Sequence, residues 1–149
     1  MGANQSFKLN NGLFRVEKVH VFMRENYVIS FKPITRKKMV IKIKKKQFHD
    51  IQDGYGPIQN WNTSNVTDMN MMFYHCRNFN KDISNWDVSN VRNMHHMFYN
   101  CRNFNKDISN WDVQNVTNMT GMFIWCIKFN RDISKWNVSN VKNMSNIFY

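Results

Sequence analysis

The stretch WDVSNVRNMHHMFYNCRNFNKDISN, residues 86–110, decides the fold, because the chain repeats it with a period of 25 residues. Residues 61–85 read WNTSNVTDMNMMFYHCRNFNKDISN, and residues 111–135 read WDVQNVTNMTGMFIWCIKFNRDISK. A fourth copy, residues 136–149, holds the first 14 positions. We call these copies units 1 to 4. Such a period is typical of repeat arrays, in which about three stacked units are needed to bury a shared core.

Apolar residues occupy the same columns in successive units, which predicts where the core lies. Val91, Met94 and Phe98 are separated by three and four residues, a spacing that favours a short helix with one apolar face. Residues 103–109 then read as a turn and a short strand. We therefore predict an α/β fold, a short leucine-rich-repeat-like solenoid of about 3.5 rungs of helix, turn and strand. The predicted core is Trp61, Trp86, Trp111, Trp136, Phe73, Phe98, Phe123, Ile83, Ile108 and Ile133.

Polar residues repeat as well. Asn side chains in the columns of Asn90 and Asn105 are expected to bond backbone groups in the turns. The column of Asp82, Asp107 and Asp132 would place like charges about 4.8 Å apart if the units stack as strands do. Two interpretations stay open for this column: turn caps offset by neighbouring Lys and Arg residues, which we favour, or a calcium-binding ladder.

The cysteines Cys76, Cys101 and Cys126 share one column of the repeat. An odd number at equal spacing does not predict a disulfide framework. Inward-facing thiols would behave as small apolar groups. The neighbouring column offers no second set of metal ligands, so we predict no metal site.

Positive charge is concentrated near the N-terminus. The net charge is +11, and residues 1–60 carry +8 of it. The segment RKKMVIKIKKK, residues 36–46, attracts anionic partners or forms a solvated basic face. It lacks the interleaved aromatic residues that stack on bases, so nucleic acid is not the expected partner. The candidate interaction residues in it are Arg36, Lys37, Lys38, Lys42, Lys44, Lys45 and Lys46.

The chain divides into three parts. Residues 1–34 are an N-terminal extension, in which alternating apolar residues over 13–34 predict a β-hairpin that turns at residues 24–26. Residues 35–60 are predicted to hold a basic capping helix and an entry loop, with Thr35 as the N-cap. A strand over Val40–Lys44 is the competing interpretation. Residues 61–149 are the four units.

Both ends of the chain carry candidate functional residues. The first six residues, MGANQS, match the N-myristoylation pattern at Gly2, and a polybasic segment is the usual second membrane signal. There is no apolar signal-peptide region and no run of about 18 apolar residues. We therefore expect a virion or cytoplasmic protein, or one peripheral to a membrane. Ile147, Phe148 and Tyr149 are expected to lie partly bare on the last unit, as a docking surface.

Catalysis is not expected. The chain has five glycines and no phosphate-binding glycine loop. Its five histidines are not spaced with any recurrent Ser, Cys or acidic partner, and no nucleophile motif is present. We predict no catalytic residue and no cofactor.

The unit consensus W-D/N-V-S-N-V-x-N-M-x-x-M-F-Y-x-C-x-x-F-N-x-D-I-S resembles the BspA-like surface-protein repeat, the mycoplasma lipoprotein-type relative of leucine-rich repeats. The resemblance covers residues 58–149, and upstream the basic helix followed by YGPIQNW, residues 55–61, is similar to the family's entry segment. Such repeats occur in bacterial and protist surface proteins and in large DNA viruses. The surface proteins carry export or lipid-attachment signals and many more repeats, and this chain departs from them in both respects.

What the resemblance implies is binding or display. We expect a non-enzymatic protein–protein interaction solenoid that serves as a structural or scaffold component of a larger assembly. A minor capsid-associated protein of a large DNA virus fits, with capsid proteins or the chain itself as partners. The alternative is a membrane-surface or adhesin-like binding protein, anchored by acylation of Gly2 and the basic segment.

Overall fold

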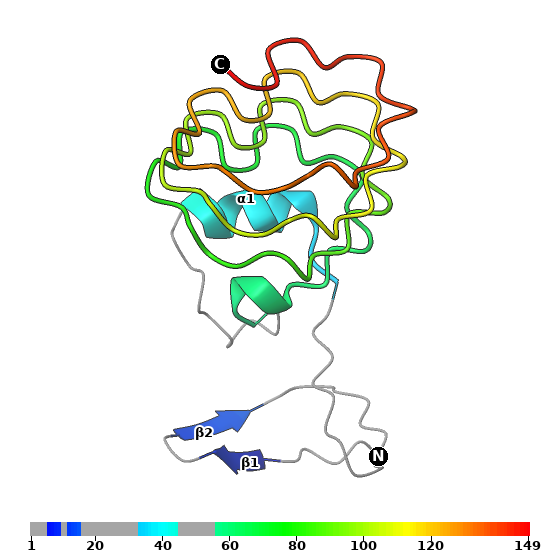
Figure 1. Cartoon of the computed structure of the whole chain (residues 1–149). Coiled ribbons are helices and arrows are strands. Elements are labelled where there is room, and N and C mark those ends of the chain that lie inside the picture. The colour runs from blue at the N-terminus through cyan, green and yellow to red at the C-terminus, as the bar shows by residue number, and fades with distance from the viewer. Residues whose placement is uncertain (1–5, 10–11, 16–32, 45–55) are drawn as a thin grey trace.

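The computed structural model describes residues 6–9, 12–15, 33–44 and 56–149 of the chain (Figure 1). Strands β1 (Ser6–Leu9) and β2 (Gly12–Arg15) pair as an antiparallel hairpin. The helices are α1 (Arg36–Lys44) and the short 3₁₀ helix η1 (Ile58–Asn60). Most of the hairpin that we predicted over 13–34 lies outside the described residues, because residues 16–32 are not among them.

Helix α1 occupies the first part of the predicted basic helix. Thr35 Oγ1 accepts the backbone N–H of Lys38 at 3.3 Å, which makes Thr35 the expected N-cap. The competing strand over Val40–Lys44 is wrong, because these residues belong to α1. Met39 and Ile43 are buried, so the helix has an apolar side that packs on the core.

The predicted α/β solenoid of helix, turn and strand is wrong. Units 1 to 4 contain neither a helix nor a strand in the described chain, and each folds as consecutive turns. Neighbouring units are joined by isolated parallel bridges, from Asp68 to Asn93, from Asn93 to Asn118, and from Asn118 to Asn143. Figure 1 shows the resulting stack of similar loops above α1.

The backbone conformation explains why the helical spacing did not produce helices. Met71 and His75 in unit 1 have positive φ angles of 53° and 60°. The equivalent residues of unit 2, His96 and Asn100, have φ angles of 52° and 57°. A right-handed helix cannot pass through left-handed residues. The apolar residues at spacings of three and four are therefore the inward-facing positions of a turning chain.

Backbone N–H groups alternate between two kinds of acceptor. The N–H groups of Met71 and Phe73 donate to carbonyls of unit 2, those of His95 and Met97, each at 2.9 Å. The intervening N–H of Met72 donates to Met69 O in its own unit at 3.2 Å. The same alternation recurs between units 2 and 3. Over residues 69–75 and their equivalents, every second N–H thus binds one unit to the next, and these polar backbone groups are satisfied without a sheet.

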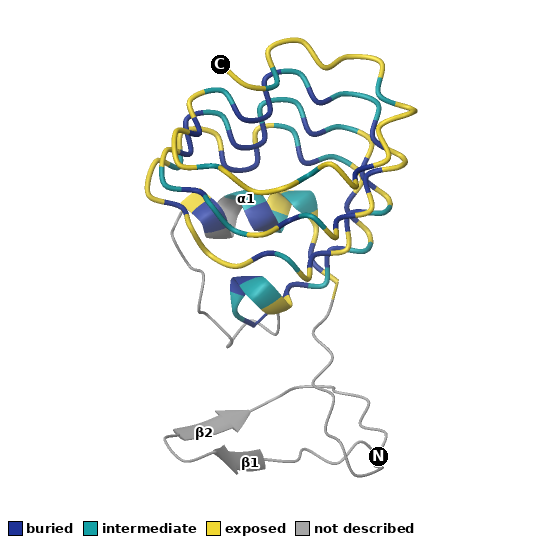
Figure 2. Cartoon of the chain, in the orientation of Figure 1, coloured by how far each residue is buried: buried dark blue, intermediate teal, exposed yellow. Residues whose placement is uncertain are grey.

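Aromatic rings stack through the centre of the array. Phe73 and Phe98 have ring centroids 5.3 Å apart, and Phe98 and Phe123 have centroids 5.6 Å apart, with nearly parallel planes. Phe148 continues this file, 5.4 Å from Phe123. A second file joins the rings of Phe79, Phe104 and Phe129. Figure 2 shows buried positions at equivalent places in the inner units, whereas unit 4 is mostly exposed.

Tryptophan and asparagine side chains add polar bonds between units. The indole Nε1–H of Trp111 donates to Ile83 O at 3.2 Å, and Trp86 and Trp136 make the equivalent bonds to Ile58 O and Ile108 O, each 28 residues earlier. Asn115 Nδ2 donates to Ser89 O at 2.8 Å. These bonds let buried indoles and turn carbonyls find partners, as buried polar groups require.

The predicted core residues lie as follows. Trp61, Trp86, Trp111, Trp136, Phe73, Phe98, Phe123, Ile83 and Ile108 are buried, and Ile133 is half-buried.

The Phe file predicts a position-dependent loss of stability. Phe98→Ala removes a fully buried ring stacked on both sides, so the free energy of unfolding should fall by about 3–5 kcal/mol. Phe148→Ala is the matched control, because Phe148 is 54% exposed and stacks on one side only. The free energy of unfolding should fall much less in this variant. Urea unfolding followed by tryptophan fluorescence measures both. Equal losses would show that the file is not the core of the stack.

Candidate functional site

The first end of the stack is sealed by α1 and the residues before it. Pro33 forms a parallel bridge with Asn62, and the N–H of Ile34 donates to Asn62 O at 2.9 Å. Arg36 forms an ion pair with Asp68, Nε to Oδ2 at 3.1 Å, and its Nη2 donates to Asn70 O at 2.7 Å. The segment 33–36 thus covers part of unit 1.

This arrangement changes the interpretation of the basic segment. Arg36 holds α1 on unit 1, so it is a structural residue here. Lys37 and Lys44 are exposed, and Lys38 is half-buried. The side chain of Lys42 and the whole of Lys45 and Lys46 lie outside the described residues, as does Gly2.

The opposite end of the stack, on unit 4, is open. Tyr149 is 86% exposed, Phe148 is 54% exposed, and Ile147 is half-buried. Val138 and Met144 are also exposed, although their equivalents in the inner units are buried. We call this surface the end face: the side of unit 4 that carries Val138, Met144 and Phe148 and has no unit stacked on it in the described chain.

Sequence reasoning missed a second apolar surface on unit 3. Trp125 and Ile127 are exposed, at 45% and 76%, and together with Arg102 they line a shallow hollow of about 230 Å³. The signal was present in the sequence. Trp125 replaces His75 and Asn100 of the earlier units, and Ile127 stands where units 1 and 2 have Arg.

A cluster of histidine and tyrosine rings covers the side of units 1 and 2. The rings of His95 and His96 stack at 3.9 Å, and His95 Nδ1 lies 3.3 Å from Asn70 Oδ1. His96 Nδ1 is buried without a hydrogen-bond partner. The His96 ring lies over Gly121, where an added Cβ atom would overlap it, so a larger residue there would require the ring to move. Burial lowers the pKa of His96, and the nearby His95 lowers it further.

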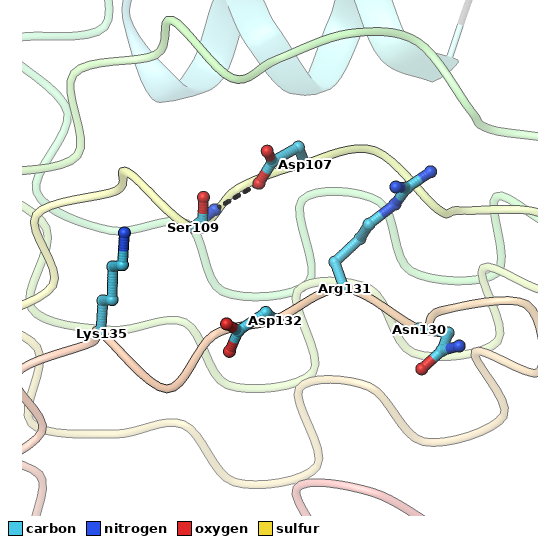
Figure 3. Close-up of a pocket in the computed structure, with 6 residues that line it drawn as sticks. All are labelled: Asp107, Ser109, Asn130, Arg131, Asp132 and Lys135. Atoms are coloured by element: carbon cyan, nitrogen blue, oxygen red, sulfur yellow. Dashed lines mark hydrogen bonds between the residues drawn. The ribbon is translucent and has the colours of Figure 1, made fainter.

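A polar hollow of about 260 Å³ lies on units 2 and 3. Figure 3 shows six residues that line it. Two of its charged side chains already have hydrogen-bond partners in the chain. Asp107 Oδ1 accepts the N–H of Ser109 at 2.9 Å, and Arg131 Nε donates to Asn105 O at 3.0 Å. The Ser109 bonds hold the pKa of Asp107 below its usual value, and Arg131 adds to this. The Asp column therefore caps turns.

The turn-cap interpretation applies to the whole column, because Asp82 and Asp132 bond Ser84 and Ser134 in the same way. Within the described ranges, no group of three or more His, Cys, Asp or Glu residues could hold a metal ion. The calcium ladder thus finds no support in the structure.

The cysteine column faces inward. Cys101 Sγ–H donates to Phe73 O at 2.9 Å, and Cys126 Sγ–H donates to Phe98 O at 2.8 Å. Burial raises the pKa of Cys126 to about 12 and raises that of Cys101 above its usual range. Since the thiolate is the nucleophile, both residues are unsuited to covalent chemistry.

None of the helices in the described part of the chain has the length and apolar character needed to span a bilayer.

The thiol column predicts selective alkylation. Half-buried Cys76 should react first with iodoacetamide under native conditions, whereas Cys101 and Cys126 should react only after unfolding. Peptide mass spectrometry over a time course distinguishes the three sites, and a sample in denaturant gives the reference rates. Equal native rates would contradict the inward placement.

The His96 environment predicts a pH-dependent stability. The pKa of His96 is lowered in the folded state, so the unfolded state binds protons more readily, and the free energy of unfolding should fall as the pH drops below about 6.5. Urea unfolding at several pH values measures this slope. His96→Gln should reduce it, and an unchanged slope in this variant would assign the effect to other groups.

The family model described as "Mycoplasma protein of unknown function, DUF285" matches residues 42–149, from within α1 to the end of unit 4. No curated protein and no solved structure matches the chain significantly. Because the match spans well over half of its residues, the chain belongs to this family of mycoplasma-type proteins of unknown function.

Proposed function

We propose that the protein is a non-enzymatic protein-binding repeat module, a structural or scaffold component of a larger assembly. The observation that carries this proposal is a set of large apolar side chains on the surface of the stack. Trp125 and Ile127 are exposed on unit 3 and line a hollow with Arg102, and Phe148 is exposed on unit 4. A cluster of large exposed apolar side chains is characteristic of a protein interaction site.

The net charge of the chain favours one chemical class of partner. A net charge of +11 favours an acidic partner and opposes association between copies of the chain. The BspA-like form of the repeat, to which the units are similar, supports the same role, because that resemblance implies binding or display. The virus-particle setting that it suggests is part of this proposal, with capsid proteins as candidate partners.

Crosslinking mass spectrometry on the native source tests the proposal. Lys142 is exposed on unit 4, whereas Lys37 and Lys44 are exposed on α1 at the closed end. We expect Lys142 to crosslink to one or two abundant structural proteins more strongly than the α1 lysines do. Recovery of the protein without protein crosslinks would overturn the proposal.

A membrane-surface role is the alternative outcome of the same experiment. The exposed Lys37 and Lys44 favour it, whereas Arg36 is engaged with Asp68 and contributes less to a basic face. In that case the protein would be recovered with membranes, and Gly2→Ala would release it because acylation requires the glycine. Unchanged membrane recovery of Gly2→Ala would exclude acyl anchoring.

A further inference from the structure

Units 1 and 2 present arginine and tyrosine side chains at their surface. Tyr74, Arg77 and Arg102 are exposed, and Tyr99 is half-buried. Each of these residues has a further unit stacked after its own. Their exposure is therefore unrelated to the open face of unit 4. We call these four residues the Arg–Tyr surface.

Contacts place the Arg–Tyr surface on one side of the stack. The rings of Tyr74 and Tyr99 stack with centroids 4.9 Å apart and an interplanar angle of 24°. The N–H of Asn103 donates to Arg77 O at 3.0 Å, so the backbone at Arg77 lies beside the backbone at Arg102. The two tyrosines and the two arginines thus form pairs that run from unit 1 to unit 2.

The guanidinium group of Arg102 is held in a fixed orientation. Its Nε donates to Asn100 Oδ1 at 2.9 Å. Since a guanidinium N–H can only donate, Asn100 must turn its Nδ2 toward His75 Nδ1, which lies 3.0 Å away and accepts. Asn100 is buried, and the His75 ring lies 5.4 Å from that of Tyr99. The terminal nitrogens of Arg102 have no acceptor in the described chain, so they are placed to bind a carboxylate together.

The surroundings of the two arginines are basic. Residues 69–81 and 88–106 contain no Asp or Glu. Neither Arg77 nor Arg102 forms an ion pair with a carboxylate in the part of the chain that the structure describes. Two guanidinium groups on adjacent units repel each other, and an anionic partner would relieve this repulsion. The charge of the Arg–Tyr surface therefore calls for an acidic ligand.

The tyrosines favour a peptide over nucleic acid as that ligand. Single-stranded nucleic acids bind by stacking their bases on aromatic faces. The rings of Tyr74 and Tyr99 already stack on each other, and the ring of Trp125 lies 5.6 Å from that of Tyr99. No base fits between rings that are this close. Carboxylates need no aromatic face, and they match the guanidinium fork in shape and charge.

We infer that the Arg–Tyr surface binds an acidic, extended segment of a protein partner, whose Asp or Glu side chains pair with Arg77 and Arg102. Alternate side chains of an extended segment point to the same side, about 6.6–6.8 Å apart, which suits arginines on adjacent units. The inference rests on the proposed function and gives it a site and a partner chemistry. Arg102 also lines the hollow of Trp125 and Ile127, where an apolar side chain of the same segment would pack.

A peptide in which Glu and Ser alternate is the probe. We would label it with fluorescein and measure its anisotropy against the full chain at about 0.15 M salt, where exposed charges more than about 8 Å apart are largely screened. The same peptide with Gln in place of Glu, and a single-stranded oligonucleotide of equal negative charge, are measured in parallel. We expect saturable binding of the Glu peptide, none of the Gln peptide and weaker binding of the oligonucleotide.

Variants locate the site. Arg102→Gln should weaken binding of the Glu peptide about tenfold, or about 1.4 kcal/mol, because it removes a charge-assisted pair. Arg77→Gln should also weaken it. Arg92→Gln is the matched control, since Arg92 is an exposed arginine of unit 2 outside the Arg–Tyr surface, and the affinity should be unchanged. Arg102→Lys keeps the charge but loses the fork, so it should bind more weakly than the wild-type chain. Urea unfolding shows whether each variant is folded.

Four results would overturn the inference: no binding of the Glu peptide, equal binding of the Gln peptide, equal weakening by Arg102→Gln and Arg92→Gln, or tighter binding of the oligonucleotide that Arg102→Gln abolishes. The inference and the proposed function can fail separately. If Lys142 crosslinks to a protein while Arg77→Gln and Arg102→Gln bind the peptide normally, the protein-binding role stands and this site is wrong. If the peptide binds at Arg102 while no protein is crosslinked, the site stands and the assembly role is wrong.

Discussion

The alternation of backbone N–H groups, one bonded within its unit and the next bonded to the following unit, is the constraint on which the rest of the structure depends. The N–H of Phe73 reaches Met97 O, and the N–H of Tyr74 turns back to Met71 O. Both kinds of bond form together only if successive units superimpose residue by residue. The gapless period of 25 follows from this, because an inserted residue would leave buried donors without acceptors.

The side-chain packing follows from the same register. Once the backbones superimpose, equivalent residues of successive units lie over one another. Each column must therefore hold a residue type that can pack against another copy of itself. Phenylalanine rings do so by parallel stacking, and Trp, Asn and Cys do so by donating to a backbone carbonyl 26 to 28 residues earlier in the chain. Left-handed residues such as Met71 cost backbone energy, and the cross-unit bond that Met71 makes offsets it.

The stack is directional because donors and acceptors at its two ends differ. At the first end, Ile34 donates to Asn62 O, and Arg36 fixes the helix to unit 1. At the other end, the N–H groups of Met144, Asn146 and Phe148 have no backbone acceptor in the described chain. The Asp column and its polar hollow serve the turns within the units.

The sequence by itself determined the units, their boundaries and which columns are apolar, since a strict repeat leaves its period and its hydrophobic positions readable. Thr35 could also be read as a cap, because that signal is local. The secondary structure could not be read, because spacings of three and four fit both a helix and a chain of turns, and only the left-handed residues distinguish them. Asn100 and Gly121 hint at such turns, but Met71 and Trp125 do not.

Only the tertiary structure decided which residues are free to act. Arg36 looked like part of a basic patch and is instead committed to Asp68 and Asn70, a pairing across more than 30 residues. Trp125 and Ile127 form an exposed apolar surface that the apolar columns of the repeat did not indicate. A side chain or backbone N–H finds a hydrogen-bond partner only if the neighbouring unit supplies one. That partner lies about 25 residues away in the sequence but is adjacent in space.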